Sequence, residues 1–280
     1  MPFVESRGLR IHYQITGRRS APPVLMLQGL GASAHAWNLQ RPALALRWRT
    51  VVLDNRGTGR SSRSVGPFSL EDLAEDALRV LDAAGIDDAH VVGVSMGGIV
   101  AQILAVRHPE RIRSLVLACT SCQQHRWRED LLREWSITAR DQGMTAVNRS
   151  AARWVMGPRM FRRVMPAFNW IGPLMSRRPN DSFASQVDAI LAIDTSIADR
   201  LAEVSKPTLV VVGDEDILTP RADAEEIAER IPGAKLVVIP GAAHDLILEH
   251  AVTFNSLLLA FLESAERHSG DVRPDDHINE

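Results

Sequence analysis

The fold is indicated most clearly by the stretch AHVVGVSMGGIVAQILAV, residues 89–106. Its first part is an apolar run with the length of a buried strand, and the residues from Met96 onward form an apolar helical stretch. Gly93 and Gly97 flank Ser95 at the junction. Glycine has no β-carbon, so this spacing predicts a sharp turn from strand to helix with neighbouring elements close to the backbone. Such a turn projects the Ser95 hydroxyl above the sheet, at the positive end of a helix.

Similar apolar runs lie on both sides of this unit and alternate with helical stretches. We expect strands at residues 2–5, 10–15, 23–29, 50–57, 89–95 and 112–119, in PTLVVVG after Lys206, and at 235–241. We expect helices at 70–84, 96–107 and 221–231. Runs that are apolar on both faces are typical of parallel strands covered by helices on both sides. The sequence therefore predicts an α/β protein with a mostly parallel sheet, opened by a hairpin.

The alternation stops between about residues 122 and 205, where the sequence indicates several short helices interrupted by Gly and Pro. Four of the six tryptophans fall in this insertion, namely Trp127, Trp135, Trp154 and Trp170. These helices could simply pack on the main domain, but we favour an apolar lid, because ligand pockets are lined mostly by apolar and aromatic side chains. We therefore expect a core of residues 1–121 and 206–266, a helical lid at 122–205 and a disordered polar tail at 267–280.

Charge and composition exclude several classes of partner. The chain of 280 residues has 32 basic and 34 acidic side chains and a formal charge of -2, so we expect neither nucleic acid nor an anionic membrane surface as partner. No run reaches the roughly 18 apolar residues of a membrane span, and the first residues do not resemble a signal peptide. We expect a cytoplasmic protein that acts on a small molecule.

Metal and redox chemistry are also disfavoured. Cys119 and Cys122 form a C-T-S-C pair that invites such an interpretation, but the pair stands alone, far along the chain. The histidines form no pair at metal-ligand spacing, so we expect neither a metal ion nor a cofactor.

A serine hydroxyl becomes a useful nucleophile when a base lies within hydrogen-bond reach and a carboxylate orients that base. His244 lies in PGAAHD directly after an expected strand, and Asp216 lies in GDEDILTP after another. Both positions are at the carboxyl ends of strands, where sites in α/β sheets gather. Asp214 competes with Asp216 for the role of the acid.

Four segments in this order resemble the α/β-hydrolases, in particular the lidded esterase, lactonase and haloperoxidase-like branch. They are LQGLG (27–31), DNRGTGRS (54–61), GVSMGG (93–98) and the pair G-x-x-D-x-x-x-P (213–220) and G-x-x-H (241–244). The resemblance covers residues 1–121 and 206–265. It implies an α/β-hydrolase fold with a mostly parallel eight-stranded sheet, helices on both faces and a helical lid after the sixth strand.

The resemblance also assigns the site residues. It implies that Ser95 is the nucleophile, His244 the base and Asp216 the orienting acid, and the family spacing favours Asp216 over Asp214. The backbone N–H groups of Leu30 and Met96 would form the oxyanion hole. Gln28 stands where the family commonly has histidine, which changes the hydrogen bonds of that loop. DNRGTGRS is interpreted as a structural signature in which Asp54 and Arg56 tie loops together.

The function implied is hydrolysis of a carboxylic ester or lactone through an acyl-enzyme, with a small apolar substrate under the lid. A serine nucleophile disfavours dehalogenases and epoxide hydrolases, which use aspartate. Alternatives with the same triad are a carbon-carbon bond hydrolase, which Val94 disfavours, and a cofactor-free haloperoxidase. A small-molecule receptor or a non-hydrolytic biosynthetic catalyst on this fold is the alternative of another class.

Overall fold

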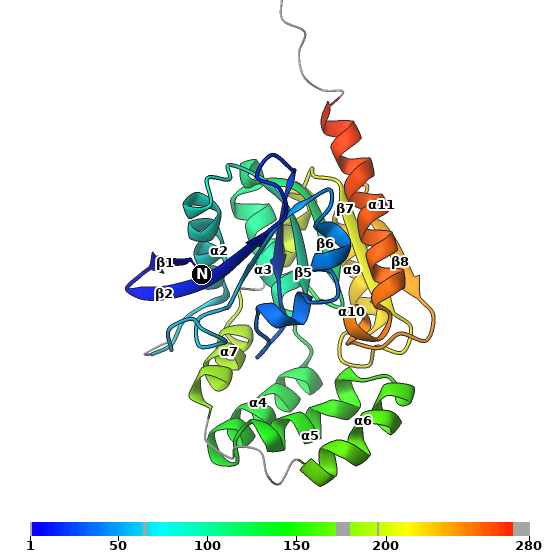
Figure 1. The fold of residues 1–280 in the computed structure, drawn as a ribbon. Coiled ribbons are helices and arrows are strands. Elements are labelled where there is room, and N and C mark those ends of the chain that lie inside the picture. Colours follow the sequence, from blue (N-terminus) through cyan, green and yellow to red (C-terminus); the bar gives the residue numbers. More distant parts are fainter. Residues whose placement is uncertain (1, 64–65, 172–179, 195, 271–280) are drawn as a thin grey trace, which may run out of the picture.

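The centre of the molecule is an eight-stranded sheet with the order β1-β2-β4-β3-β5-β6-β7-β8 (Figure 1). The computed structural model describes residues 2–63, 66–171, 180–194 and 196–270. The strands are β1 (Phe3–Ser6), β2 (Leu9–Thr16), β3 (Pro23–Leu27), β4 (Arg49–Leu53), β5 (Ala89–Val94), β6 (Ile112–Ala118), β7 (Thr208–Gly213) and β8 (Lys235–Ile239). The pairs β1–β2 and β2–β4 are antiparallel, and the pairs from β4 to β8 are parallel. The predicted α/β fold and mostly parallel sheet are confirmed.

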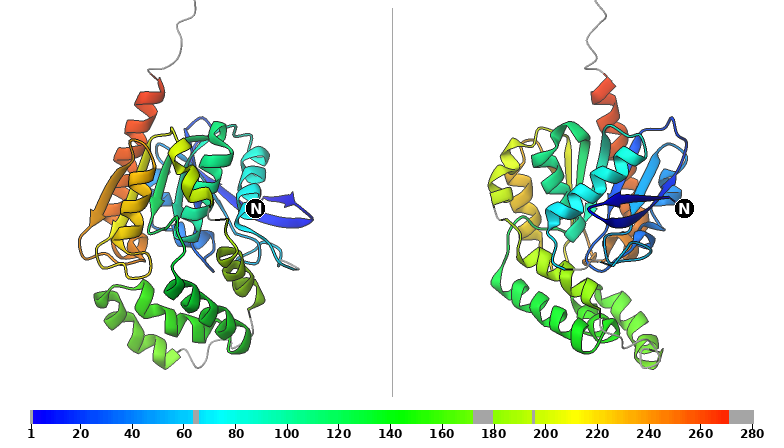
Figure 2. Two further views of the ribbon diagram at one scale, coloured as in Figure 1. Left: turned by 180° about the vertical axis from the view of Figure 1, so that it is seen from behind. Right: turned by 90° about the vertical axis from the view of Figure 1, so that its left-hand side faces the viewer.

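Helices cover both faces of the sheet, as the apolar runs predict (Figure 2). One face carries α2 (Leu70–Ala83), α3 (Met96–Arg107) and α9 (Arg221–Arg230); the other carries α1 (Arg41–Leu44) and α11 (Ala251–Gly270). Successive strand residues point to opposite faces. Val91 of β5 therefore packs in the core beside α3, whereas Val92 packs in the core that contains Phe254 of α11.

Short helices complete the loops of the core. They are the 3-10 helices η1 (Ala34–Trp37), η2 (Pro109–Arg111) and η4 (Arg200–Glu203), together with α8 (Ser196–Asp199) and α10 (Leu246–Glu249). The start of α2 is fixed by a capping box, in which Ser69 Oγ accepts from the Asp72 N–H and the Asp72 carboxylate accepts from the Ser69 N–H. The predicted helix boundaries at 70–84, 96–107 and 221–231 agree with α2, α3 and α9 to within one residue.

The chain between β6 and β7 forms a helical group at one end of the sheet (Figures 1 and 2). Its helices are α4 (Arg126–Asp141), α5 (Met144–Val155), α6 (Pro158–Ile171) and α7 (Asp181–Leu191). Trp127 stacks on Trp154 with ring centroids 5.8 Å apart, and Trp135 is buried. The side chain of Trp170 lies outside the described residues. The group starts where β6 ends, so it covers the carboxyl edge of the parallel strands.

The C-terminal helix is longer than the sequence pattern indicates. Helix α11 continues to Gly270, so residues 267–270 are helical and the predicted tail cannot begin at 267. The reason is that helical hydrogen bonds propagate past the last buried side chain, Ala265, without needing further apolar residues. Residues 271–280 of the predicted tail lie outside the described residues. No helix in the described part of the chain has the length and apolar character needed to cross a membrane.

Candidate active site

Ser95 sits in a strained turn between β5 and α3. Its backbone angles are φ 54° and ψ -122°, in the left-handed region that side chains with a β-carbon avoid. A β-carbon at Gly93 would collide with the carbonyl of Gly97, and one at Gly97 would collide with the carbonyl of Leu27. The two flanking glycines are thus required for the close approach of the turn to β3, as the sequence predicts.

The order of the strands reverses next to this turn. Strand β3 lies between β4 and β5, so the chain leaves β3 toward one side and returns to its other side. Ligands in open α/β sheets bind at such switch points, outside the carboxyl ends of the strands. Ser95 follows β5, Leu30 lies in the loop after β3, Asp216 follows β7 and His244 follows β8. The four loops meet at one edge.

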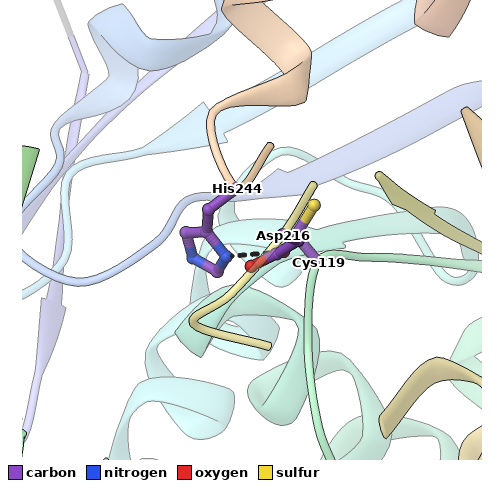
Figure 3. A group of neighbouring side chains, drawn as sticks. All are labelled: Cys119, Asp216 and His244. Carbon is purple, nitrogen blue, oxygen red and sulfur yellow. Dashed lines mark hydrogen bonds and ion pairs between the residues drawn. The ribbon is translucent and has the colours of Figure 1, made fainter. Parts of the chain in front are cut away.

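Three of the predicted residues form one connected chain of polar contacts. The Nε2 atom of His244 lies 3.0 Å from the Oγ atom of Ser95. Its Nδ1 atom lies 2.9 Å from Oδ2 of Asp216, a contact drawn in Figure 3. Asp214, by contrast, is exposed and accepts a hydrogen bond from the Gly241 N–H. A hydroxyl, an imidazole and a carboxylate in this order can move a proton away from the serine.

The charges of the pair support this arrangement. Burial alone would lower the pKa of His244, but the charge of Asp216 and its hydrogen bond raise that pKa above the ordinary value. Burial alone would raise the pKa of Asp216, but His244 and the hydrogen bonds of Thr219 hold that pKa below the ordinary value. Asp216 is therefore an anion across the neutral range, and it favours a proton on His244.

Asp216 is held by contacts that the sequence motif does not reveal. Its Oδ1 atom accepts from the backbone N–H groups of Leu218 and Thr219, each at 2.9 Å. The hydroxyl of Thr219 donates to Oδ2 at 2.8 Å. No motif marks Thr219 in the sequence; its position three residues after Asp216 is the one signal that indicates such a turn.

Leu30 and Met96 line the same cavity as Ser95. In the described part of the chain, neither N–H group donates a hydrogen bond to a protein acceptor. Met96 is the first residue of α3, where a free N–H group is expected and the helix dipole is positive. Two such donors can stabilise negative charge that develops on an oxygen bound beside Ser95.

Two buried glutamines hold the loop that carries Leu30. Gln28 replaces the usual histidine and donates from Nε2 to the carbonyl of Leu53 at 2.7 Å. Gln186 of α7 is fully buried and accepts from the Gly31 N–H at 2.9 Å. Its Nε2 atom donates to the carbonyl of Arg56 at 3.2 Å. Gln186 therefore links the helical group to this loop, a contact that no sequence motif indicates.

The DNRG segment has the structural role that its sequence indicates. The Asp54 carboxylate contacts His12 Nδ1 at 2.8 Å and accepts from the N–H of Ala34 at 2.8 Å. Arg56 forms a buried two-point ion pair with Asp76. These contacts tie neighbouring loops together, and no residue of the segment lines the cavity at Ser95.

A cavity of about 350 Å³ lies over Ser95, between the strand ends and the helical group. Its apolar wall comes from α4, α5 and α7, and includes Leu132, Trp135, Met144, Val147, Phe183 and Ile190. Of the tryptophans in the insertion, Trp135 lines this cavity, while Trp127 and Trp154 stack on each other elsewhere. An apolar wall of this kind is typical of a small-molecule site.

Cys119 lies next to Asp216 (Figure 3) and is not among the residues that line the cavity. Ligand atoms of Cys119, Asp216 and His244 lie within 4.8 Å of one another, the spacing of a metal site. However, burial and the nearby Asp216 carboxylate raise the pKa of the Cys119 thiol well above its ordinary value. A protonated thiol is a poor metal ligand, and both Asp216 oxygens are already hydrogen-bonded. The cluster therefore does not fit a metal ion. Cys119 and Cys122 are both free thiols.

Comparison with known proteins identifies the family. The family profile described as alpha/beta hydrolase fold matches residues 22–251. The chain is 32% identical over 278 residues to the protein named as a carbamate hydrolase, RutD, of Azorhizobium caulinodans, covering 93% of this chain and 98% of that protein. It is 27% identical over 261 residues to 3-oxoadipate enol-lactonase 2 of Acinetobacter baylyi, covering 92% of this chain and 95% of that protein. The enol-lactonase structure from Burkholderia xenovorans aligns with a TM-score of 0.84 at 29% identity, covering 94% of this chain and 100% of that one. These matches confirm the predicted family, and the chain belongs to the alpha/beta hydrolase fold family of hydrolases.

Proposed function

We propose that this protein hydrolyses a carboxylic ester or a lactone through an acyl-enzyme on Ser95. The observation that carries the proposal is the connected geometry of Ser95, His244 and Asp216, with contacts of 3.0 and 2.9 Å. Two unused backbone N–H groups beside the serine supply the second requirement of acyl transfer, a site for the oxyanion.

The first half of the reaction forms the acyl-enzyme. His244 Nε2 takes the hydroxyl proton while Ser95 Oγ attacks the carbonyl carbon, and the carbonyl electron pair moves to its oxygen. The N–H groups of Leu30 and Met96 stabilise that oxyanion. When the carbonyl re-forms, the bond to the leaving oxygen breaks, and this oxygen takes the proton from His244.

The second half repeats these steps with water. His244 removes a proton from a water molecule, which attacks the acyl carbon, and the released Ser95 oxygen recovers the proton. Asp216 keeps the imidazole oriented and favours its protonated form in both halves. The ester or lactone is thereby converted to a carboxylic acid and an alcohol, and the enzyme returns to its starting state.

The helical group between β6 and β7 acts in this proposal as a lid. Its apolar wall supports an apolar acyl or alcohol group in the substrate, and it excludes water from the site during acyl transfer. A carbamate carbonyl can be attacked in the same way. The similarity to RutD makes a carbamate the second substrate class to assay.

The test is hydrolysis of p-nitrophenyl acetate, butyrate and octanoate by the native protein, Ser95→Ala and the control Ser256→Ala. Ser256 is exposed on α11 and bonds its own helix through Val252, so its hydroxyl should not matter. We expect activity that rises from acetate to a longer chain and that is lost in Ser95→Ala alone. Absence of turnover for every ester, or equal activity of Ser95→Ala and the native protein, would refute the proposal.

A further inference from the structure

One carboxyl group in the cavity has no part in the proposed reaction. Asp245, the residue after His244, lines the cavity and is half-buried. Its carboxylate makes no hydrogen bond and no ion pair with any residue that the structure describes. A carboxyl group in the lining of a mostly apolar cavity, without a protein partner, is poorly solvated. A donor on a bound ligand would restore its lost hydrogen bonds.

The backbone of Asp245 is fixed from both sides. Its N–H donates to the carbonyl of Val155, at the end of α5, at 2.9 Å. Its carbonyl accepts from the N–H groups of Leu248 at 2.8 Å and Glu249 at 3.0 Å, in the first turn of α10. The residue is thus held where the core meets the helical group. These backbone contacts fix the position of Asp245 in the cavity wall, next to His244 in the chain.

No cation in the described cavity wall neutralises this carboxylate permanently. The guanidinium of Arg128 reaches the wall, but it binds Asp223 at 2.5 Å and the carbonyls of Leu218 and Gln123 at 3.1 and 2.6 Å. His244 already contacts Asp216 and Ser95. Among the described residues, Asp245 therefore sets the charge that a substrate meets.

Three titratable groups act on Asp245. Burial raises the pKa of Asp245 to about 6, against the opposing charge of His244 and with the help of Glu249 and Asp216. Glu249 lies on α10 and accepts from the Gly157 N–H, while Asp216 belongs to the loop after β7. Asp245 is consequently ionised at pH 8 and largely protonated at pH 5.

Building on the proposed function, we propose that Asp245 selects substrates by charge. The cavity takes an ester or lactone that bears a cationic or N–H donor group, and it rejects one that bears a carboxylate. Like charges in a partly desolvated site repel strongly, so a carboxylate substrate is penalised in binding and in the transition state. A donor group on the substrate is favoured by the same carboxylate.

The experiment compares kcat/KM for esters of equal size and different charge. On the acyl side these are p-nitrophenyl butyrate, p-nitrophenyl hemisuccinate and the p-nitrophenyl ester of β-alanine. On the alcohol side they are butyrylcholine and its neutral analogue 3,3-dimethylbutyl butyrate. Native protein is measured at pH 5 and pH 8, beside Asp245→Asn, Asp245→Ser and the matched control Asp214→Asn, whose carboxylate is exposed outside the cavity.

At pH 8 we expect the kcat/KM of the native protein for the anionic ester to lie about 10- to 100-fold below that for its neutral partner, or the kcat/KM for a cationic ester to lie as far above it. This ratio should shrink in Asp245→Asn and Asp245→Ser and at pH 5, and it should persist in Asp214→Asn. If the native protein turns over these esters without any charge preference in either series, the inference fails and the proposed function stands. The same holds for a preference that survives both substitutions or does not weaken at pH 5. Turnover of none of these esters refutes the proposed function, and the inference with it.

Discussion

The strained backbone of Ser95 predicts that one inactivating substitution stabilises the protein relative to another. Ser95→Ala and Ser95→Gly both remove the hydroxyl that contacts His244 at 3.0 Å, so they differ only in the β-carbon. At φ 54° and ψ -122° a residue with a β-carbon stores about 1–3 kcal/mol of strain, which glycine relieves. Glycine loses about 0.4–1 kcal/mol through the greater freedom of the unfolded chain. We expect Ser95→Gly to exceed Ser95→Ala in free energy of unfolding by about 1–2 kcal/mol.

Urea unfolding followed by circular dichroism measures this difference, and thermal unfolding gives a second reading. For a chain of this size the expected gain corresponds to roughly 2–8 °C in Tm. The control is the pair Ser256→Gly and Ser256→Ala on α11, where glycine should be the less stable by about 1 kcal/mol because the backbone is helical. If Ser95→Gly is also less stable than Ser95→Ala, the turn is not strained and the reasoning fails.

Three further predictions concern other parts of the molecule. Gln186→Met leaves the Gly31 N–H and the buried carbonyl of Arg56 without this partner. The free energy of unfolding, measured by urea titration, should therefore fall by about 2–5 kcal/mol. A loss below about 1 kcal/mol would contradict the importance of these contacts. Asp216→Asn should lower kcat for ester hydrolysis by up to about 10⁴-fold while Asp214→Asn stays close to native, and equal losses would contradict the assignment. Burial lowers the pKa of His90 in the folded protein, so the folded state binds this proton less readily than the unfolded chain. The stability that His90 contributes is therefore present above the unfolded pKa of about 6.5 and is lost as pH falls through the folded pKa. Unfolding free energies at pH 7.5 and pH 5 should therefore differ less in His90→Gln than in the native protein, and an unchanged difference would contradict this.

The parts of the fold set by local sequence were predictable. A largely apolar run as short as residues 89–94 favours a strand buried on both faces, and such strands need covering helices. Gly93 and Gly97 predicted the turn at Ser95 because glycine alone permits that approach. Asp216 and His244 could be placed because both follow strands whose carboxyl ends must share one edge.

The contacts that depend on the docking of the helical group were not predictable. Gln186 is one polar residue in an amphipathic helix, and its role arises only when α7 packs against the loops at Gly31 and Arg56. Asp245 belongs to no sequence motif, and its contact with the end of α5 forms only when the helical group packs on the core. The end of α11 was misjudged because polar composition does not prevent a helix from continuing past its last buried residue.

The central claim, that Ser95 is the acylated nucleophile, is tested most directly by a p-nitrophenyl phosphonate that reacts with activated serines. The labelled protein is digested and the modified peptide is located by mass spectrometry, while p-nitrophenol release and residual ester hydrolysis are measured. The account predicts one equivalent of label on Ser95, with activity lost in proportion and no labelling of Ser95→Ala. Label on another residue, or no label while the protein still hydrolyses esters, would contradict it.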